Sequence, residues 1–530
     1  MKLFRFAVLI LALAPPALAA PREQQPPSFL GASIDVRVVN VEAVVTDARG
    51  NRVEGLAAPA FRLLVDGREV PITYFTEVVE GEMATPLAEP GAPAPATALA
   101  PGGKVGTSYL VFIDDSFGIK AQRDIVLRRL AAALRFDAED RMAVVAFDGR
   151  RIELLSDWTG DREALRRAFA EAQLRPSRGV ERLAWRRSAD LFDDARTEGT
   201  AAAPSRIYGE IESASAAAAA AMRGIAAPPG RKVLLLLSGG WPVVSPRELL
   251  ADPLRRIPSA FYVPRPEELF EPVTDTANLL GYTIYPIDVQ GIDPESTWAD
   301  ARDSAPRPAS FITSEWERGV HQAFGFLANE TGGKAVLNSA RLNSFERVES
   351  DTRSYYWLGF TPEWRADGQR HDIRVEVRRS GLKVRARGGF SDLSPGTRAE
   401  LATESLLLFG RGQGLGRIRV RTGEPRRVGL WSMELPVSLE IPAGALTPLP
   451  ADGGYEVQAT LSMGALDEWG GRTRLQSVPL RLSLPSAPGP DVYARFETTL
   501  KLRKVSQRLV FAVDDGLSDS RSWGELEVKP

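Results

Sequence analysis

The chain has 530 residues, a formal net charge of −2 and no cysteine. Its length predicts several folded units, and the nearly balanced charge argues against a global attraction to nucleic acid or to anionic membranes. Because cysteine is absent and the only histidines are His321 and His371, disulfide frameworks, thiolate metal sites and cysteine nucleophiles are excluded.

The first residues have the pattern of a secretory signal peptide. Lys2 and Arg5 precede an apolar run over residues 6–14, and Ala17-Leu18-Ala19 forms a cleavage site of small residues. The run is shorter than the ~20 residues that a membrane span requires. We therefore expect residues 1–19 to be removed, leaving a periplasmic or secreted chain with no transmembrane segment.

Alternating apolar residues next predict an N-terminal β module over residues 30–80. Segments 61–65 and 70–75 are joined by Asp66-Gly67, which is a typical hairpin turn. Residues 81–105 then contain five prolines among alanine and glycine, with little apolar surface to bury. We expect this stretch to be a linker and the first place that a protease cuts.

The pattern changes over residues 106–350, where apolar strands alternate with amphipathic helices. The strand-like runs lie at 109–113, 143–147, 233–237 and 282–287. Strands that are apolar on both faces and separated by helices predict a mostly parallel sheet covered on both sides. Segment 152–155 is expected to be an antiparallel partner of 143–147.

Strand patterns return after residue 350. Residues 351–395 predict a β extension packed on or following the α/β domain, in which 355–360 and 373–377 look like paired strands. Short alternating segments over 400–530 predict a C-terminal β-sandwich. The expected fold class is therefore α/β and β multi-domain, with a doubly wound central sheet flanked by N-terminal and C-terminal β-sandwich-like modules.

Three parts of the chain together resemble the von Willebrand factor A (VWFA)-related proteins that are abundant in Acidobacteria. They are residues 36–47 with 61–67, residues 230–240, and residues 355–360 with 385–390. The resemblance implies that the central sheet is a VWFA-like (Rossmann-like) domain. Such domains bind a divalent cation at the carboxyl ends of the strands, and the cation accepts a carboxylate from a partner protein.

The family pattern is Asp-x-Ser-x-Ser after the first strand, a threonine in a later loop, and an aspartate after the central strand. Asp114 and Ser116 match the first two positions, whereas Gly118 and Gly239 replace the second serine and the later aspartate. The stretch 177–181, where the threonine belongs, contains none. The resemblance thus implies a degenerate metal-ion-dependent adhesion site with Asp114 and Ser116 as its metal ligands.

Two further carboxylates, Asp115 and Asp148, are near these positions but outside the family pattern. We expect no cofactor, or at most Mg²⁺ or Ca²⁺ held as loosely as about 10⁻⁴–10⁻³ M. The alternative is that Asp114, Asp115 and Ser116 cap the helix that follows them, which needs no cation.

Three functions are compatible with these features. The first is an exported protein-binding protein for adhesion or interaction, with an unidentified protein partner and no nucleic acid. The second is a structural scaffold of an envelope or surface assembly. The third is a hydrolase with an unrecognised carboxylate-based site, but no G-x-S-x-G, H-E-x-x-H or Walker motif is present. We therefore expect no catalytic residues and no enzymatic activity.

Overall fold

The computed structural model describes most of residues 38–530, which form one compact unit. The described ranges are 38–84, 103–179, 202–243 (without 226 and 229), 264–289, 309–337, 343–362, 368–391, 394–410 and 416–529 (without 452–453, 474, 490 and 518–519). The expected signal peptide and most of the expected linker lie outside the described residues.

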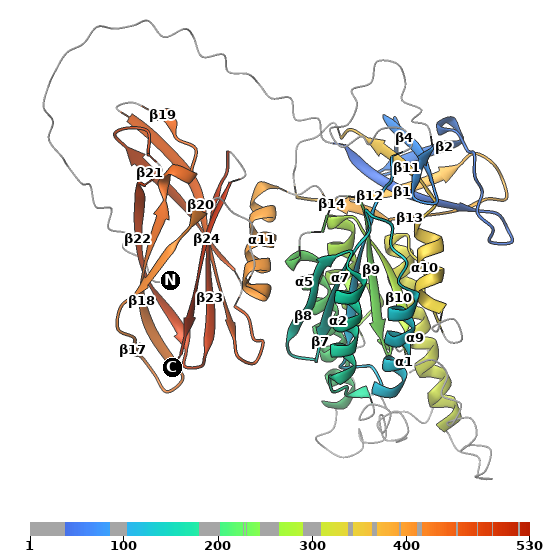
Figure 1. Cartoon of the computed structure of the whole chain (residues 1–530), viewed down its shortest axis with the longest axis horizontal. Coiled ribbons are helices and arrows are strands. Elements are labelled where there is room, and N and C mark those ends of the chain that lie inside the picture. Colours follow the sequence, from blue (N-terminus) through green and yellow to red (C-terminus); the bar gives the residue numbers. More distant parts are fainter. Residues whose placement is uncertain are drawn as a thin grey trace, which may run out of the picture. The chain divides into compact units, whose positions relative to one another are not determined.

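The central sheet has five strands in the order β10-β9-β6-β7-β8 (Figure 1). They are β6 (Thr107–Asp114), β7 (Arg141–Phe147), β8 (Ile152–Thr159), β9 (Arg231–Ser238) and β10 (Tyr282–Asp288). All pairs are parallel except β7 with β8, which confirms the predicted antiparallel partner. The chain passes from β6 to β7 on one side of the sheet and later from β9 to β10 on the other side. The strand order therefore reverses between β6 and β9.

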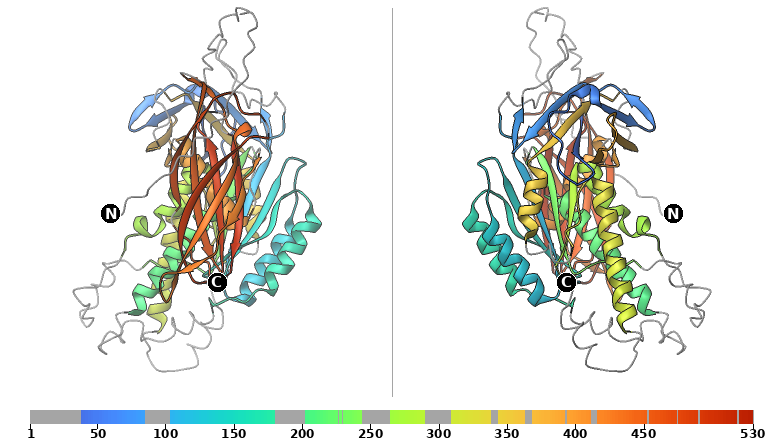
Figure 2. Two further views of the ribbon diagram at one scale, coloured as in Figure 1. Left: turned by 90° about the vertical axis from the view of Figure 1, so that its left-hand side faces the viewer. Right: turned by 90° about the vertical axis from the view of Figure 1, so that its right-hand side faces the viewer.

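Helices cover both faces of this sheet. One face carries α5 (Ala202–Gly224), α7 (Pro266–Leu280) and α9 (Ala309–Thr331), and the other carries α1 (Lys120–Ala133), α2 (Arg162–Leu174) and α10 (Ser344–Thr352). Figure 2 shows the blue-green α1 and α2 on the opposite side of the sheet from α9. Within β6, Leu110 and Phe112 enter one core while Val111 and Ile113 enter the other, as expected for a strand buried on both faces.

Strands from two distant segments form a first β-sandwich. The early strands are β1 (Val39–Thr46), β2 (Phe61–Val65), β3 (Arg68–Val70), β4 (Tyr74–Val79) and β5 (Glu82–Ala84). The late strands are β11 (Tyr355–Phe360), β12 (Arg370–Val377), β13 (Lys383–Ala386) and β14 (Gly389–Ser391). One sheet has the order β13-β1-β11-β4-β5 and the other β14-β12-β2-β3. Val41 is opposite Leu358 and Leu63 is opposite Val375, so both segments share each sheet.

Two details of the predicted strand pattern are wrong. The expected pairing of β11 with β12 does not occur, because β1 and β4 flank β11 while β2 and β14 flank β12. The start of the C-terminal module is helical, not extended, since α11 spans Pro395–Phe409. Leu406 and Leu407 of this helix are buried against Val510 and Ala512. Periodicity indicates which residues face a core, but it leaves the neighbouring strand undetermined.

The first sandwich contacts the amino-terminal ends of the central strands. Arg231, the first residue of β9, is 1% exposed and lies 3.1 Å from the Glu42 carboxylate. Its guanidinium donates to the Thr352 carbonyl at 2.9 Å and lies 4.3 Å from the Tyr355 ring centroid. Burial raises the pKa of Glu42, and the positive charge of Arg231 opposes that rise. This contact leaves the carboxyl-terminal ends of the strands at the other edge of the sheet.

A cut between residues 85 and 102 should leave both fragments associated. Strands β1 and β2 are hydrogen-bonded to β11 and β12, so the sheets, and not the covalent connection, hold the early segment in place. A specific protease site inserted in this range would be cleaved and the product run on gel filtration. We expect one native peak that resolves into two fragments under denaturing electrophoresis. Elution of a separate N-terminal fragment without denaturant would contradict this.

The C-terminal β-sandwich contains the remaining strands. One sheet has the order β15-β24-β23-β20-β19, with β21 also on β20, and the other has β16-β18-β17, with β22 also on β18. The bounds are β15 (Gly416–Arg417), β16 (Arg419–Thr422), β17 (Arg426–Arg427), β18 (Ser432–Pro442), β19 (Leu449–Ala451), β20 (Gly454–Asp467), β21 (Gln476–Leu484), β22 (Tyr493–Arg503), β23 (Gln507–Asp515) and β24 (Arg521–Val528). Leu439, Leu461 and Phe511 are fully buried between the sheets.

Among the described helices, none is long and apolar enough to cross a membrane.

Candidate functional site

Asp114 ends β6 and is 1% exposed. One carboxylate oxygen accepts from the Ser116 amide at 3.0 Å, the Phe117 amide at 3.3 Å and the Ser116 hydroxyl. The other accepts from the Ser238 hydroxyl at 2.7 Å and the Trp241 indole N–H at 2.8 Å. The loop 114–118 and the loop after β9 therefore meet at the carboxyl edge of the sheet. Five donor groups of the described chain hold the Asp114 carboxylate in this position.

Trp241 reaches Asp114 because two glycines let the chain after β9 pass close to its neighbours. A methyl group on Gly239 would lie 2.0 Å from the Phe117 carbonyl oxygen. Gly240 has a φ of +108°, and a methyl group there would lie 2.4 Å from Val320. The Trp241 ring is 0% exposed and stacks on Phe270. Backbone thus fills the place where the family pattern has an aspartate side chain.

The stretch 177–179 lies against the loop after β6, where the resemblance implies the threonine loop. The Arg178 amide donates to the Asp115 carbonyl at 2.9 Å, and the Gly179 amide donates to the Gly118 carbonyl at 2.9 Å. The Ser177 hydroxyl also donates to the Gly118 carbonyl. Residues 180 and 181 lie outside the described part of the chain. The one hydroxyl of this stretch is thus used to hold two loops together.

Asp115 turns away from Asp114 and pairs with two arginines. Its carboxylate contacts the Arg123 guanidinium and accepts from Arg175 Nε at 2.8 Å. Asp115 and Arg123 are each 1% exposed. Burial raises the pKa of Asp115, and both guanidinium groups oppose the rise. A carboxylate that is already bound by two guanidinium groups is poorly placed to bind a cation as well.

Asp148 closes the turn between β7 and β8. Its Oδ1 accepts from the backbone amides of Arg150 at 2.8 Å and Arg151 at 2.7 Å. This is the usual local role of an aspartate at a turn. Asp148 therefore shapes the turn that lies beside the Asp114 loop.

The helix-capping alternative is wrong. The N-cap residue of α1 is Ile119, and no side chain accepts a hydrogen bond there. The amides that Asp114 accepts from belong to Ser116 and Phe117, which precede the helix. Asp114 therefore organises the loop between β6 and α1 and not the first turn of the helix.

No group of three or more acidic or histidine side chains is arranged to hold a metal within the residues that the structure describes. Asp114, Asp115 and Asp148 each bind donors from the chain itself. The two histidines lie on other elements: His371, in β12, pairs with Asp66 at 2.9 Å, and His321 lies in α9. Weak cation binding at Asp114 and Ser116 stays a prediction from the resemblance.

Millimolar Mg²⁺ or Ca²⁺ should raise the melting temperature by no more than about 5 °C, because ligand stabilisation follows the ratio of free cation to dissociation constant. A cation would also have to displace donors from Asp114, and Mg²⁺ gives up its waters reluctantly. Thermal unfolding with added cation or with chelator measures this. A micromolar dissociation constant that is abolished in Asp114→Ala would contradict the expectation.

Exposed arginines lie beside the Asp114 loop. A methyl group on Gly149 would lie 3.3 Å from Ser116 Cβ and 3.8 Å from Arg178 Nη1, so Arg178 and Ser116 flank the same turn. Arg178, Arg150 and Arg151 are exposed. The structure records no side-chain hydrogen bond or ion pair for these three arginines among the described residues. Sequence reasoning missed them, because single surface arginines belong to no motif.

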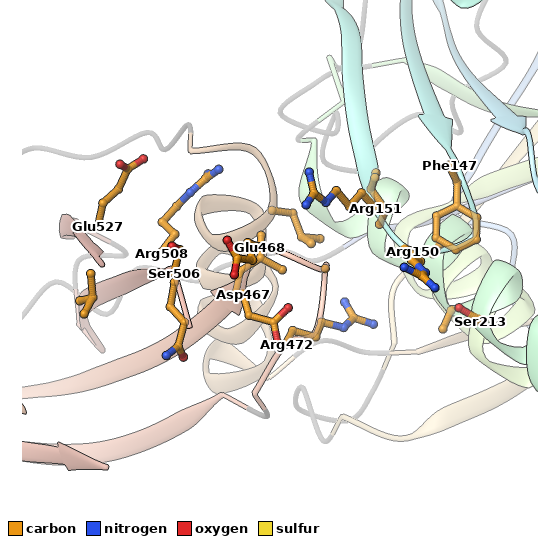
Figure 3. A pocket seen from close by; sticks show the side chains of 18 of the residues that line it. Phe147, Arg150, Arg151, Ser213, Asp467, Glu468, Arg472, Ser506, Arg508 and Glu527 are labelled. Carbon is orange, nitrogen blue, oxygen red and sulfur yellow. The ribbon is translucent and has the colours of Figure 1, made fainter. Parts of the chain in front are cut away.

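A cavity of about 430 Å³ adjoins the same turn. Figure 3 shows Arg150 and Arg151 on one side of it and Asp467, Glu468 and Arg508 of the C-terminal sandwich on the other. Five basic side chains and three carboxylates line the cavity, so side chains of both charges face it.

No protein-family model and no curated protein matches this chain. Among solved structures, it is similar to a candidate beta-galactosidase from Bacteroides fragilis (16% identity over 21% of this chain and 16% of that chain, TM-score 0.16). It is also similar to the vWF domain of the type V pili tip protein Mfa5 from Porphyromonas gingivalis (19% identity, 26% of this chain and 38% of that chain, TM-score 0.15). A variant of the PilB minor pilin from Streptococcus sanguinis is similar as well (8% identity, 60% of this chain and 87% of that chain, TM-score 0.23).

The chain spans less than two fifths of the length of the first two structures. All three TM-scores are 0.23 or lower, so these similarities carry no argument about function.

Proposed function

We propose that this chain is an exported protein-binding protein, periplasmic or secreted, that serves adhesion or interaction and catalyses no reaction. Its central domain is VWFA-like, with a degenerate metal-ion-dependent adhesion site. In this proposal the partner binds at the carboxyl edge of the central sheet without a bridging cation.

The state of Asp114 is the observation that carries the proposal. Its carboxylate is buried, and both oxygens accept hydrogen bonds from the chain. Gly239 allows no aspartate beside it, because a Cβ there would overlap the Phe117 carbonyl. At this edge, the polar side chains of the loops therefore bind one another. Only Asp114 and Ser116, the first two residues of the pattern, match a metal-dependent site.

Arg178 supplies a substitute for the cation. A guanidinium group pairs with a carboxylate through two parallel hydrogen bonds, and it needs no metal to do so. Arg178 is exposed beside the loop that holds Asp114 and Ser116. The partner is accordingly a protein with exposed aspartate or glutamate side chains.

The test uses the mature chain as bait against the envelope and secreted fractions of its native host. We expect the bait to retain the captured protein equally in Mg²⁺ and in chelator. Arg178→Ala should lower the affinity for this protein at least about tenfold, since an ion pair at an interface contributes that much when desolvated. Arg129→Ala, which removes an exposed arginine from the middle of α1, is the matched control. Capture that requires Mg²⁺, or that survives Arg178→Ala unchanged, would refute the metal-free mode.

A further inference from the structure

The tip of the β17–β18 hairpin exposes apolar side chains. Strand β17 ends at Arg427 and β18 begins at Ser432, so the loop between them is Val428-Gly429-Leu430-Trp431. Leu430 is 88% exposed and Trp431 is 81% exposed. These are the two highest exposures among the large apolar side chains of the described sandwich. Such exposure is costly in water and usually marks a contact surface.

Basic residues surround the base of this tip. Residues 426–434 and 501–504 together contain five basic side chains and one carboxylate. Ser432 is opposite Arg503 in the ladder of β18 with β22, and the Lys504 amide donates to the Trp431 carbonyl at 3.0 Å. The two stretches are therefore held side by side, which places the positive charge around the apolar tip.

Part of this charge is available for a ligand. Arg426 pairs with Glu434 at 2.6 Å and Arg503 pairs with Asp467 at 3.1 Å. For the side chains of Arg427, Lys501 and Lys504, the described residues provide no hydrogen bond or ion pair. The chain as a whole carries a net charge of −2, so this cluster is a local feature.

We propose that this hairpin tip docks the protein on an anionic lipid surface. Leu430 and Trp431 enter the boundary between headgroups and acyl chains, and Arg427, Lys501 and Lys504 lie against the lipid phosphates. An apolar tip surrounded by positive charge is complementary to that interface, where tryptophan is favoured. A neutral protein groove would give Arg427, Lys501 and Lys504 no anionic counterpart, whereas the lipid phosphates supply one.

The first test measures flotation of the full mature chain with phosphatidylcholine vesicles, with and without about one-third phosphatidylglycerol. We expect binding only to the anionic vesicles, weakened by raised salt. The double variant Leu430→Ser with Trp431→Ser should bind at least about tenfold more weakly, because two apolar side chains are no longer buried in lipid. Leu517→Ser is the matched control, since Leu517 is 55% exposed at the far end of β23.

The second test uses the absence of cysteine from the chain. An environment-sensitive fluorophore on Leu430→Cys should shift to the blue when anionic vesicles are added, and the same label on Leu517→Cys should not. Figure 1 shows β17 and β19 at opposite ends of the sandwich, and Leu517 is at the β19 end.

Three outcomes would overturn the proposal: no binding of the unmodified chain to anionic vesicles, equal binding without phosphatidylglycerol, or an equal shift of both labels. Arg178→Ala should bind vesicles like the unmodified chain. The lipid contact can thus fail or succeed independently of the proposed protein contact at the carboxyl edge.

Discussion

Replacing Gly239 by aspartate, which restores the residue of the family pattern, is expected to destabilise the protein by more than about 4 kcal/mol. The Cβ atom of any side chain at this position would lie 2.0 Å from the Phe117 carbonyl oxygen and 2.8 Å from the Phe117 carbonyl carbon. Backbone atoms at such a distance must move, and here they belong to the loop that Asp114 organises. Urea unfolding of the variant measures the loss, provided that the slope of the transition is unchanged.

Gly118→Ser is the control for this substitution, because it restores another residue of the family pattern. A Cβ atom at Gly118 would lie 3.1 Å from the Asp114 carbonyl oxygen, which a small shift relieves. We expect a loss of roughly 1 kcal/mol, in the ordinary range of single substitutions. If Gly239→Asp instead folds with unchanged stability and binds Mg²⁺ tightly, the described course of the chain after β9 is wrong.

Asp114→Ala should cost about 3–5 kcal/mol, because it removes the acceptor for several buried donors at once. The donors left without a partner include the Ser238 hydroxyl and the Trp241 indole N–H, both fully buried. A helix cap alone would be worth only about 1 kcal/mol. The loss of stability for Asp114→Asn should lie between the value of a helix cap and the value for Asp114→Ala. The asparagine amide keeps one acceptor oxygen but places an NH₂ group against other donors.

Single deletions of the donors provide the comparison. Trp241→Phe removes one hydrogen bond, and Ser238→Ala removes two, because the Ser238 hydroxyl also accepts from the Gly240 amide at 3.2 Å. We expect about 1–3 kcal/mol for each substitution because Asp114 keeps its other donors. The same urea unfolding, repeated with millimolar Mg²⁺, should give the same losses. A loss of only about 1 kcal/mol for Asp114→Ala would show that its carboxylate contributes no more than an ordinary cap.

The parallel sheet could be predicted because its strands are apolar on both faces. Val111 and Phe112 are adjacent in the sequence but enter different cores, and only a sheet covered on both sides requires both to be apolar. The neighbours of β11 could not be predicted, because β1 pairs with it across more than 300 residues. Strand periodicity contains no information about partners at that distance.

The candidate site was predictable only in its position. Asp114 and Gly239 each follow an apolar strand, and parallel strands bring such ends together. The hydrogen-bond partners of Asp114 could not be predicted. They depend on the position of Trp241, which follows two glycines, and no sequence pattern links those glycines to an aspartate. Likewise, the sequence left open whether Asp115 faces a cation or the buried Arg123.

The shared first sandwich also constrains how the chain acquires its structure. The Leu56 amide donates to the Tyr356 hydroxyl, which follows it by 300 residues. Contacts of such long sequence separation form late, because a large loop must close first. When the ribosome has made β1 to β5, β2 can pair with β3 and β4 can pair with β5. The partners of β1 and of the other edges of β2 and β4 are missing until β11, β12 and β13 are synthesised. The first sandwich is therefore complete only after the whole central domain, residues 107–352, has been synthesised.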